Sequence, residues 1–70
     1  QLKLDDEYVS TFEEMEAAQA AAIFTEMSGD LDTVVKILRS LNADTRSAIL
    51  GALASRDAVF AAKLTQLLAP

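Results

Sequence analysis

Residues 12–27 read FEEMEAAQAAAIFTEM, and residues 38–53, which read LRSLNADTRSAILGAL, carry the same apolar pattern 26 residues later. Each segment holds two pairs of apolar residues, and the two members of a pair are three positions apart. The first pair occurs a third time, at Leu64 and Leu67. A period of this length is typical of helical repeats, in which each unit buries its apolar face against its neighbours. The pattern therefore favours a scaffold over an enzyme.

The chain is predicted to be all-α, a compact right-handed α-α superhelix of about five short helices. Apolar residues recur at helical spacing, whereas no segment shows the sustained alternation of a strand. We expect residues 1–70 to form one domain, a fragment of a longer protein, with repeat units at residues 12–37 and 38–67. The expected helices cover residues 5–14, 17–27, 31–41, 43–54 and 56–68.

Short polar residues mark the expected helix ends. Asp30, Asn42 and Ser55 are the expected N-caps, and Gly29 suits the left-handed position that often ends a helix. The alanines of residues 17–22 should let a neighbouring helix approach closely. Since the connections are only one to three residues long, we expect consecutive helices to fold back on one another. The side chains expected to point inward are Tyr8, Phe12, Met15, Ile23, Phe24, Met27, Leu31, Val34, Val35, Leu38, Leu41, Ile49, Leu50, Leu53, Val59, Phe60, Leu64, Leu67 and Leu68.

The composition excludes several kinds of chemistry. The chain has no Cys and no His, which excludes thiolate zinc sites, histidine acid–base catalysis and Ser-His-Asp triads. Neighbouring carboxylates such as Glu13 and Glu14 point in different directions on a helix. No apolar run approaches the length of about 20 residues that a membrane helix needs, so we expect no membrane insertion of this segment. We predict a protein that is not an enzyme and needs no cofactor.

The net charge of −5 is unevenly distributed. Residues 1–32 carry nine acidic residues against Lys3, a net charge of −8, whereas residues 33–70 carry five basic and two acidic residues, a net charge of +3. The two halves can attract each other within the fold, between copies in a homo-oligomer, or toward different partners. Five basic residues with Phe60 as the nearby aromatic make a poor footprint for nucleic acid, so we expect none as a partner.

Three apolar motifs carry a family resemblance: Phe12-x-x-Met15-Glu16-Ala17-x-x-Ala20-Ala21-x-Ile23-Phe24-x-x-Met27, Val35-x-Ile37-Leu38-x-x-Leu41 and Ala48-Ile49-Leu50-x-x-Leu53. With them the chain resembles the intracellular N-domain of MgtE-type magnesium transporters and the related FliG middle domain. It is most similar to the C-terminal domain of MotE-like flagellar-associated proteins. This resemblance implies a bacterial interaction domain that docks protein partners in a flagellar-associated or membrane-tethered assembly, at the membrane or in the cytoplasm. The alternative it implies is a Mg²⁺-responsive cytosolic regulatory domain of a magnesium transporter.

The resemblance to the transporters, which use acidic surfaces for regulatory magnesium, makes some carboxylates candidate Mg²⁺ ligands. One or two carboxylates with several waters satisfy Mg²⁺. The spacing of Asp30 and Asp32 is not that of an EF-hand, because no further ligands follow. Helix capping and solubility explain the same residues without a metal. The candidates are Glu13, Glu14, Glu16, Asp30 and Asp32.

A basic docking face for a protein partner is expected on the polar sides of the last three helices. Arginine is enriched among the residues that dominate interfaces, so Arg39 and Arg46 are the first candidates, with Lys36 and Lys63 beside them. An ordinary solvated surface is the alternative interpretation of these residues.

Four large side chains could instead form a groove for a partner helix, since methionine adapts to varied surfaces. Their helical spacing favours the core. These residues are Phe12, Met15, Phe24 and Met27.

A small, acidic, helical chain also suits an acyl carrier protein. That chemistry needs a serine hydroxyl directly before the leucine at a helix start, for attachment of phosphopantetheine. The residue before Leu31 is Asp30, and Ser28 lies three positions away from Leu31. The interaction domain is therefore the favoured hypothesis.

Overall fold

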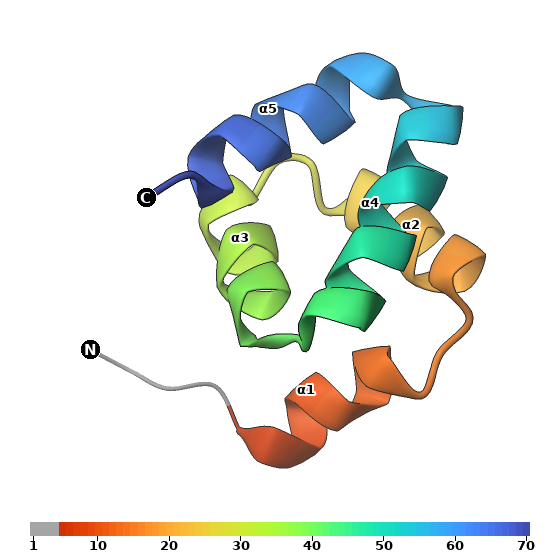
Figure 1. Ribbon diagram of the computed structural model, residues 1–70, viewed down its shortest axis with the longest axis vertical. Helices are drawn as coiled ribbons and strands as arrows, with labels where there is room; N and C mark the ends of the chain where they lie inside the picture. Colours follow the sequence, from red (N-terminus) through yellow and green to blue (C-terminus); the bar gives the residue numbers. More distant parts are fainter. Residues whose placement is uncertain (1–4) are drawn as a thin grey trace.

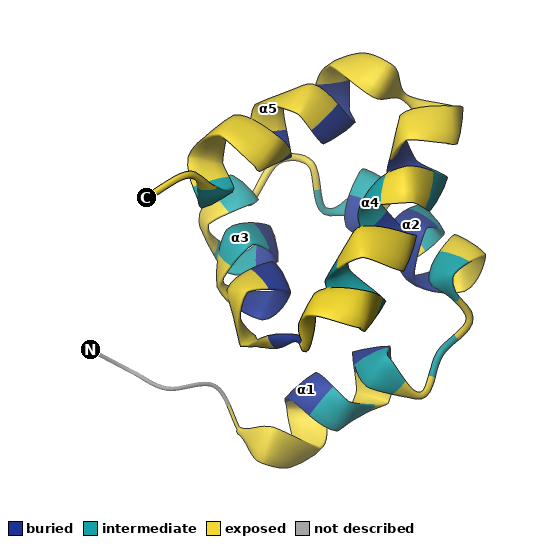
Figure 2. Ribbon diagram, in the orientation of Figure 1, coloured by how far each residue is buried: buried dark blue, intermediate teal, exposed yellow. Residues whose placement is uncertain are grey.

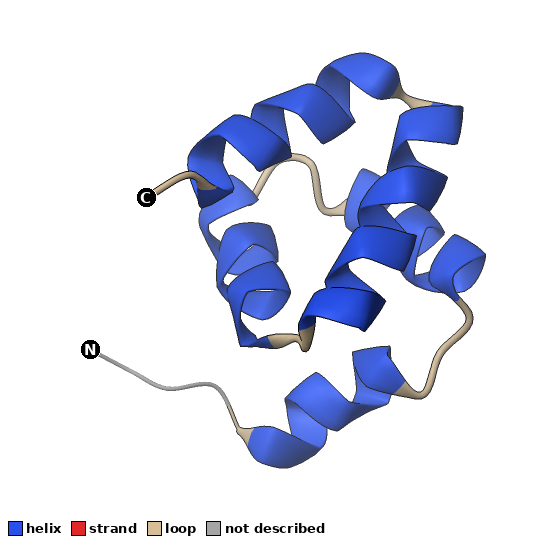
Figure 3. Cartoon of the chain, viewed as in Figure 1, coloured by secondary structure: helices blue, strands red, loops and turns tan. Residues whose placement is uncertain are grey.

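The computed structural model describes residues 5–70 and confirms the all-α prediction, with five helices and no strand among these residues (Figures 1 and 3). Lys3, which enters the charge of the acidic half, lies outside the described residues. The helices are α1 (Asp6–Glu13), α2 (Ala17–Glu26), α3 (Leu31–Ser40), α4 (Ala43–Arg56) and α5 (Ala58–Leu68).

Side chains cap the start of every helix except α2. An oxygen of Asp5, Asp30, Asn42 or Asp57 accepts a backbone N–H from the first turn of the helix that follows it. Each such bond satisfies a donor that the helix itself leaves unpaired. Glu16 stands at the N-cap of α2 without a side-chain bond to it. The predicted caps Asp30 and Asn42 are confirmed.

The predicted cap Ser55 is wrong, because α4 continues to Arg56. The Ser55 hydroxyl donates to the carbonyl of Gly51 at 3.3 Å, inside α4. The cap of α5 is Asp57, whose Oδ1 accepts the backbone N–H of Phe60 at 3.1 Å. A carboxylate at this position also interacts favourably with the positive end of the helix dipole, which a hydroxyl does not.

The prediction that Gly29 adopts a left-handed conformation is also wrong, since neither glycine of the chain has a positive φ. The turn after α2 instead closes with backbone hydrogen bonds between residues whose φ angles are all negative. The N–H of Met27 donates to the carbonyls of Ile23 and Phe24, and the N–H of Asp30 donates to the carbonyl of Met27 at 2.8 Å. This turn does not require glycine, and space around Gly29 is open.

Two of the three most extensive helix contacts join helices that are two places apart in the sequence. The most extensive helix pairs are α2 with α4, α4 with α5, and α3 with α5. The prediction that consecutive helices fold back on one another therefore holds for α4 and α5, whereas α2 and α3 pack most against helices two places along. α1 and α5 lie at opposite ends of the long axis of the molecule (Figure 1).

One hydrophobic core joins all five helices (Figure 2). In α2, the fully buried Ala20 and Ala21 leave room for close approach, as predicted for this alanine run. Val9, Ile37 and Ala61 belong to the core although they are not among the residues expected to point inward. The buried residues are Val9, Phe12, Ala20, Ala21, Phe24, Val34, Ile37, Leu38, Leu41, Ile49, Leu53, Phe60, Ala61 and Leu64.

Four residues expected to point inward are exposed instead. Val59 is 81% exposed and Leu67 is 44% exposed, both on α5. Tyr8 on α1 and Ile23 on α2 are exposed to a similar degree as Leu67. Other predicted core residues, such as Met15 and Met27, are partly buried against the core.

The helix positions follow the repeat offset closely. α2 begins at Ala17 and α4 begins 26 residues later at Ala43. α1, α3 and α5 begin at Asp6, Leu31 and Ala58, so each starts within one residue of the same offset. The first residues of the three repeated pairs share one environment, since all are buried: Phe12, Leu38 and Leu64.

Candidate functional site

Arg46, a predicted docking residue, serves the end of a neighbouring helix. Its Nε donates to the carbonyl of Leu38 at 2.8 Å and its Nη2 to the carbonyl of Leu41 at 2.7 Å. Nη2 also lies 3.5 Å from the carbonyl of Arg39. These carbonyls belong to the last turn of α3 and its C-cap, Leu41, where the helix has no donors for them. A positively charged guanidinium there also interacts favourably with the negative end of the helix dipole. Arg46 is thus a structural residue.

Glu13 binds the start of α4, close to the end of α3 that Arg46 binds. Its Oε2 accepts the backbone N–H of Asn42 at 3.2 Å and the Asn42 Nδ2 at 3.3 Å, so the end of α1 is attached to the start of α4. The carboxylate also faces the positive end of the α4 dipole. Because this carboxylate is engaged in the fold, it is a poor candidate for a metal ligand.

Arg46→Met should lower the free energy of unfolding by about 1.5 to 3 kcal/mol, the usual worth of hydrogen bonds to a charged group. Methionine keeps much of the apolar stem and removes the donors. Urea denaturation followed by circular dichroism measures the loss. Arg56→Met, at an exposed position in the last turn of α4, is the matched control and should cost less than about 1 kcal/mol. Equal losses in the two variants would contradict the capping role of Arg46.

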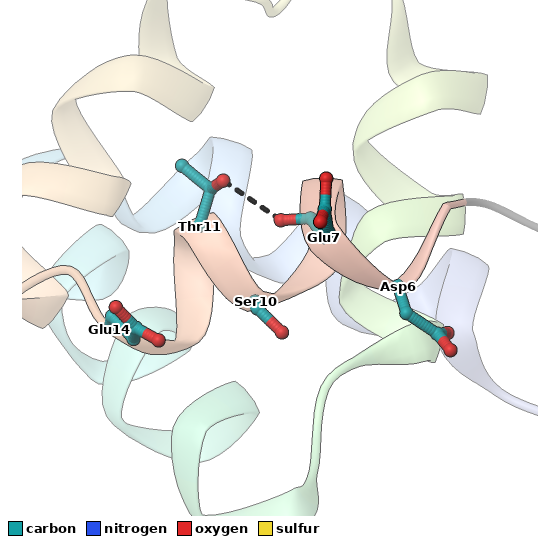
Figure 4. A pocket seen from close by; sticks show the side chains of 5 residues that line it. All are labelled: Asp6, Glu7, Ser10, Thr11 and Glu14. Carbon is teal, nitrogen blue, oxygen red and sulfur yellow. Dashed lines mark hydrogen bonds between the residues drawn. The ribbon is translucent and has the colours of Figure 1, made fainter.

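The acidic candidates for Mg²⁺ lie apart. Glu14 lines a shallow groove of about 310 Å³ on the outer face of α1, together with Asp6, Glu7, Ser10 and Thr11. Figure 4 shows the carboxylates of this groove pointing away from one another, while the Thr11 hydroxyl donates to the Glu7 carbonyl at 3.0 Å. Across residues 5–70 no group of three or more Asp, Glu, His or Cys side chains is placed to hold a metal ion.

The remaining acidic candidates have separate positions. Glu16 stands before α2 without a capping bond from its side chain, and Asp32 lies on an exposed face of α3. Asp30 caps α3: Oδ2 accepts the Thr33 hydroxyl at 2.7 Å and Oδ1 accepts the Thr33 N–H at 3.3 Å. These two bonds, the hydroxyl bond first, lower the pKa of Asp30 below its usual value, against a small opposing effect of burial and with help from the charge of Lys36.

The cap at Asp30 should make stability depend on pH in the acidic range. The pKa of Asp30 is lower in the folded chain than its ordinary value of 3.8, so protonation favours the unfolded chain. The contribution is therefore complete above that value and is lost as the pH falls through the lower, folded-state pKa. Thermal melting of the native chain and of Asp30→Ala across this range should show their difference shrinking at the acidic end. A difference that stays constant with pH would contradict this prediction.

Two of the predicted basic residues, Lys36 and Arg39, line a second groove, which we call the α3–α5 groove. It has a volume of about 300 Å³ and is lined by Asp32, Val35, Lys36, Arg39 and Leu67. The Nη2 of Arg39 donates to the carbonyl of Leu67 at 2.9 Å, which ties the end of α5 to α3. The exposed Lys63 lies one helical turn before Leu67 on α5. Lys36, Arg39 and Lys63 thus belong to one region of the surface, and Arg46 does not.

The exposed apolar residues of α5 are the part of this surface that the sequence interpretation missed. Val59 and Leu67 both satisfy a helical apolar stripe, yet both are exposed. For Val59 the repeat contains a signal. The residues at the equivalent positions of the earlier units are Glu7 and Thr33, which are polar and not buried. Comparison across the repeat therefore indicates an outward position, where the stripe within α5 alone does not.

The four residues considered for a groove that binds a partner helix are in or against the core. Phe12 and Phe24 are buried and their rings are stacked, with centroids 5.1 Å apart. Met15 and Met27 are partly buried against the same core. The core interpretation of these residues is therefore the right one.

Comparison with known proteins found no match to this chain. No family model matches the chain, and no curated protein and no solved structure matches it either. The resemblance to MgtE-type and MotE-like domains therefore stays a prediction. In the part of the chain that the structure describes, none of the helices has the length and apolar character needed to span a membrane.

Proposed function

We propose that this chain is a non-enzymatic protein-interaction domain, MotE-like, that docks partners in a flagellar-associated or membrane-tethered assembly. The observation that supports docking most is the exposure of Val59, at 81%, whereas the other large aliphatic residues between positions 5 and 70 are mostly covered. Removing one such side chain from water contributes about 1.5 to 3 kcal/mol, which favours a bound partner. Val59 and Leu67 both belong to α5 and are about two turns apart along it.

The polar residues also support binding rather than chemistry. Glu13 and Asp30 are occupied by helix capping, and Arg46 by the end of α3. Lys36 and Arg39 on α3 lie beside the partly buried Val35 and the exposed Leu67 of α5, and this mixture of basic and apolar residues is typical of interface centres and their rims. No observation in residues 5–70 favours magnesium regulation, because the candidate carboxylates do not gather at one point.

Affinity capture from a native lysate tests the proposal, with the native chain compared with Val59→Glu. A charge at this position should weaken the affinity for a captured partner at least tenfold, which corresponds to about 1.4 kcal/mol of binding free energy. Ala54→Glu, at an exposed position of α4, is the matched control and should keep the partner. Circular dichroism checks that both variants fold. Absence of any partner, or a partner that Val59→Glu retains in full, would contradict docking through α5.

A further inference from the structure

The α3–α5 groove combines an apolar floor with a rim that carries more basic than acidic groups. Leu67 and the partly buried Val35 form the floor. The rim carries two basic residues, Lys36 and Arg39, and one acidic residue, Asp32. Lys63 adds a third basic side chain one turn from Leu67. Asp32 is four residues before Lys36 on α3 and so can offset part of that charge, whereas Arg39 lies at the other end of the groove.

Comparison across the repeat indicates that Leu67 lacks a covering helix. Leu41, the equivalent of Leu67 in the preceding unit, is only 2% exposed, compared with 44% for Leu67. The carbonyl of Leu41 is bound by Arg46 from α4, the helix that follows it, whereas the carbonyl of Leu67 is bound by Arg39 from α3. A helix laid across Leu67 would therefore give this position the cover that Leu41 already has.

Arg39 is suited to receive a carboxylate. A guanidinium has five N–H donors in a fixed plane, and the bond to Leu67 engages one nitrogen. That bond also restrains the side chain, so less conformational entropy is lost when a second partner binds. A carboxylate can then bind two donors at once, which is the strongest arrangement for this pair. The local charge of the rim thus favours an acidic partner over a basic one.

The acidic end of the molecule does not cancel this preference. The molecule is 28 Å along its longest axis, and α1, which carries much of the negative charge, lies at the end opposite α5 (Figure 1). Exposed charges farther apart than about 8 Å are largely screened at physiological ionic strength. An acidic segment at the groove is therefore governed mainly by Lys36, Arg39 and Lys63.

The length of the groove suits about two turns of a partner helix. Its residues on α3 run from Asp32 to Arg39, which corresponds to about 10 Å along the helix axis. A helix that binds in a groove presents apolar residues at intervals of three or four positions. We propose that the α3–α5 groove binds an acidic amphipathic helix of a partner protein, with an aliphatic side chain against Val35 and Leu67 and a carboxylate on Arg39. This inference rests on the proposed docking function and names the class of partner.

Titration of the ¹⁵N-labelled full chain with a synthetic peptide tests the inference. The probe is a helical peptide with leucines one turn apart and glutamates beside them, and its control carries lysine in place of each glutamate. The glutamate peptide should shift the amide signals of residues 32–39 and 63–67, and the lysine peptide should bind at least tenfold more weakly. Arg39→Glu and Arg39→Gln should each weaken binding of the glutamate peptide, the first variant more strongly. Arg56→Glu, an exposed basic position outside the groove, should leave it unchanged.

Several results would overturn the inference. These are shifts centred outside the groove, equal binding of the two peptides, or binding that Arg39→Glu leaves intact. Concentration-dependent shifts of the groove residues without peptide, together with failure to bind the probe, would assign the groove to contacts between copies of this chain. A captured partner that is lost in Val59→Glu and kept in Arg39→Glu would leave the docking function standing and overturn this inference alone.

Discussion

Phe24→Ala is expected to lower the free energy of unfolding by about 3 to 5 kcal/mol, the usual cost of truncating a buried aromatic residue. Phe24 is fully buried, and its ring stacks on that of Phe12 at 5.1 Å with an angle of 21° between the planes. Truncation therefore leaves a cavity and removes a main contact of α1 with the rest of the core. Stabilities of about 0.05 to 0.15 kcal/mol per residue are usual, so a chain of this length can lose much of its folded population.

Urea denaturation at neutral pH measures this effect. Tyr8→Ala is the matched control, because Tyr8 is also an aromatic neighbour of Phe12, edge-on at 5.4 Å, but is 41% exposed. Its loss should be limited to about 0.5 to 1.5 kcal/mol, the worth of an aromatic pair. If Phe24→Ala does not fold, Phe24→Leu should give a measurable intermediate loss. A loss in Phe24→Ala no larger than in Tyr8→Ala would place Phe24 outside the centre of the core.

Local signals were enough to predict the five helices and two of the four side-chain caps. Asp30 and Asn42 are short polar residues directly before apolar helical stripes, and each makes the predicted bond to the first turn of its helix. The start of α5 differs because Ser55 and Asp57, two positions apart, are both residue types that favour N-caps. In the structure the Asp57 carboxylate accepts the N–H of Phe60 and so caps α5. Serine and aspartate are about equally common at N-caps, so residue type alone did not decide between Ser55 and Asp57.

The burial of individual residues depends on contacts between distant helices. Ile37 is fully buried although its equivalents in the other units, Thr11 and Lys63, are exposed. No comparison within the repeat predicts this burial, because the equivalent positions in α1 and α5 hold polar residues. Ile23 shows the opposite case, since it is partly exposed while its equivalent Ile49 is fully buried.

The roles of the charged residues were harder to predict for the same reason. In the sequence Arg46 and Arg39 look alike as arginines of a basic face, yet Arg46 binds the carbonyl of Leu38 in the last turn of α3 and the carbonyl of the C-cap Leu41. A basic residue just past a short connection is placed to reach the last carbonyls of the preceding helix, so a signal existed for Arg46. Arg39 binds a carbonyl 28 residues away, and only the packing of α3 on α5 brings the two together.

Leu53→Ala is expected to lower the free energy of unfolding by about 2 to 5 kcal/mol, because Leu53 is fully buried and α4 packs against both α2 and α5. The truncation would leave a cavity within the core that α4 shares with α2 and α5. Thermal and urea unfolding should therefore both show a large loss without a change in helix content at low temperature.

Leu50→Ala provides the control within the same helix and with the same side chain. Leu50 is only partly buried against the core, so part of its surface remains in water in the folded chain, and a smaller loss is expected. In the repeat, Leu50 is equivalent to Phe24 and Leu53 to Met27, so burial has moved from the first member of the pair in α2 to the second in α4. Equal losses in Leu50→Ala and Leu53→Ala would mean that both positions of the pair support the core, and that α4 is rotated from the orientation described above.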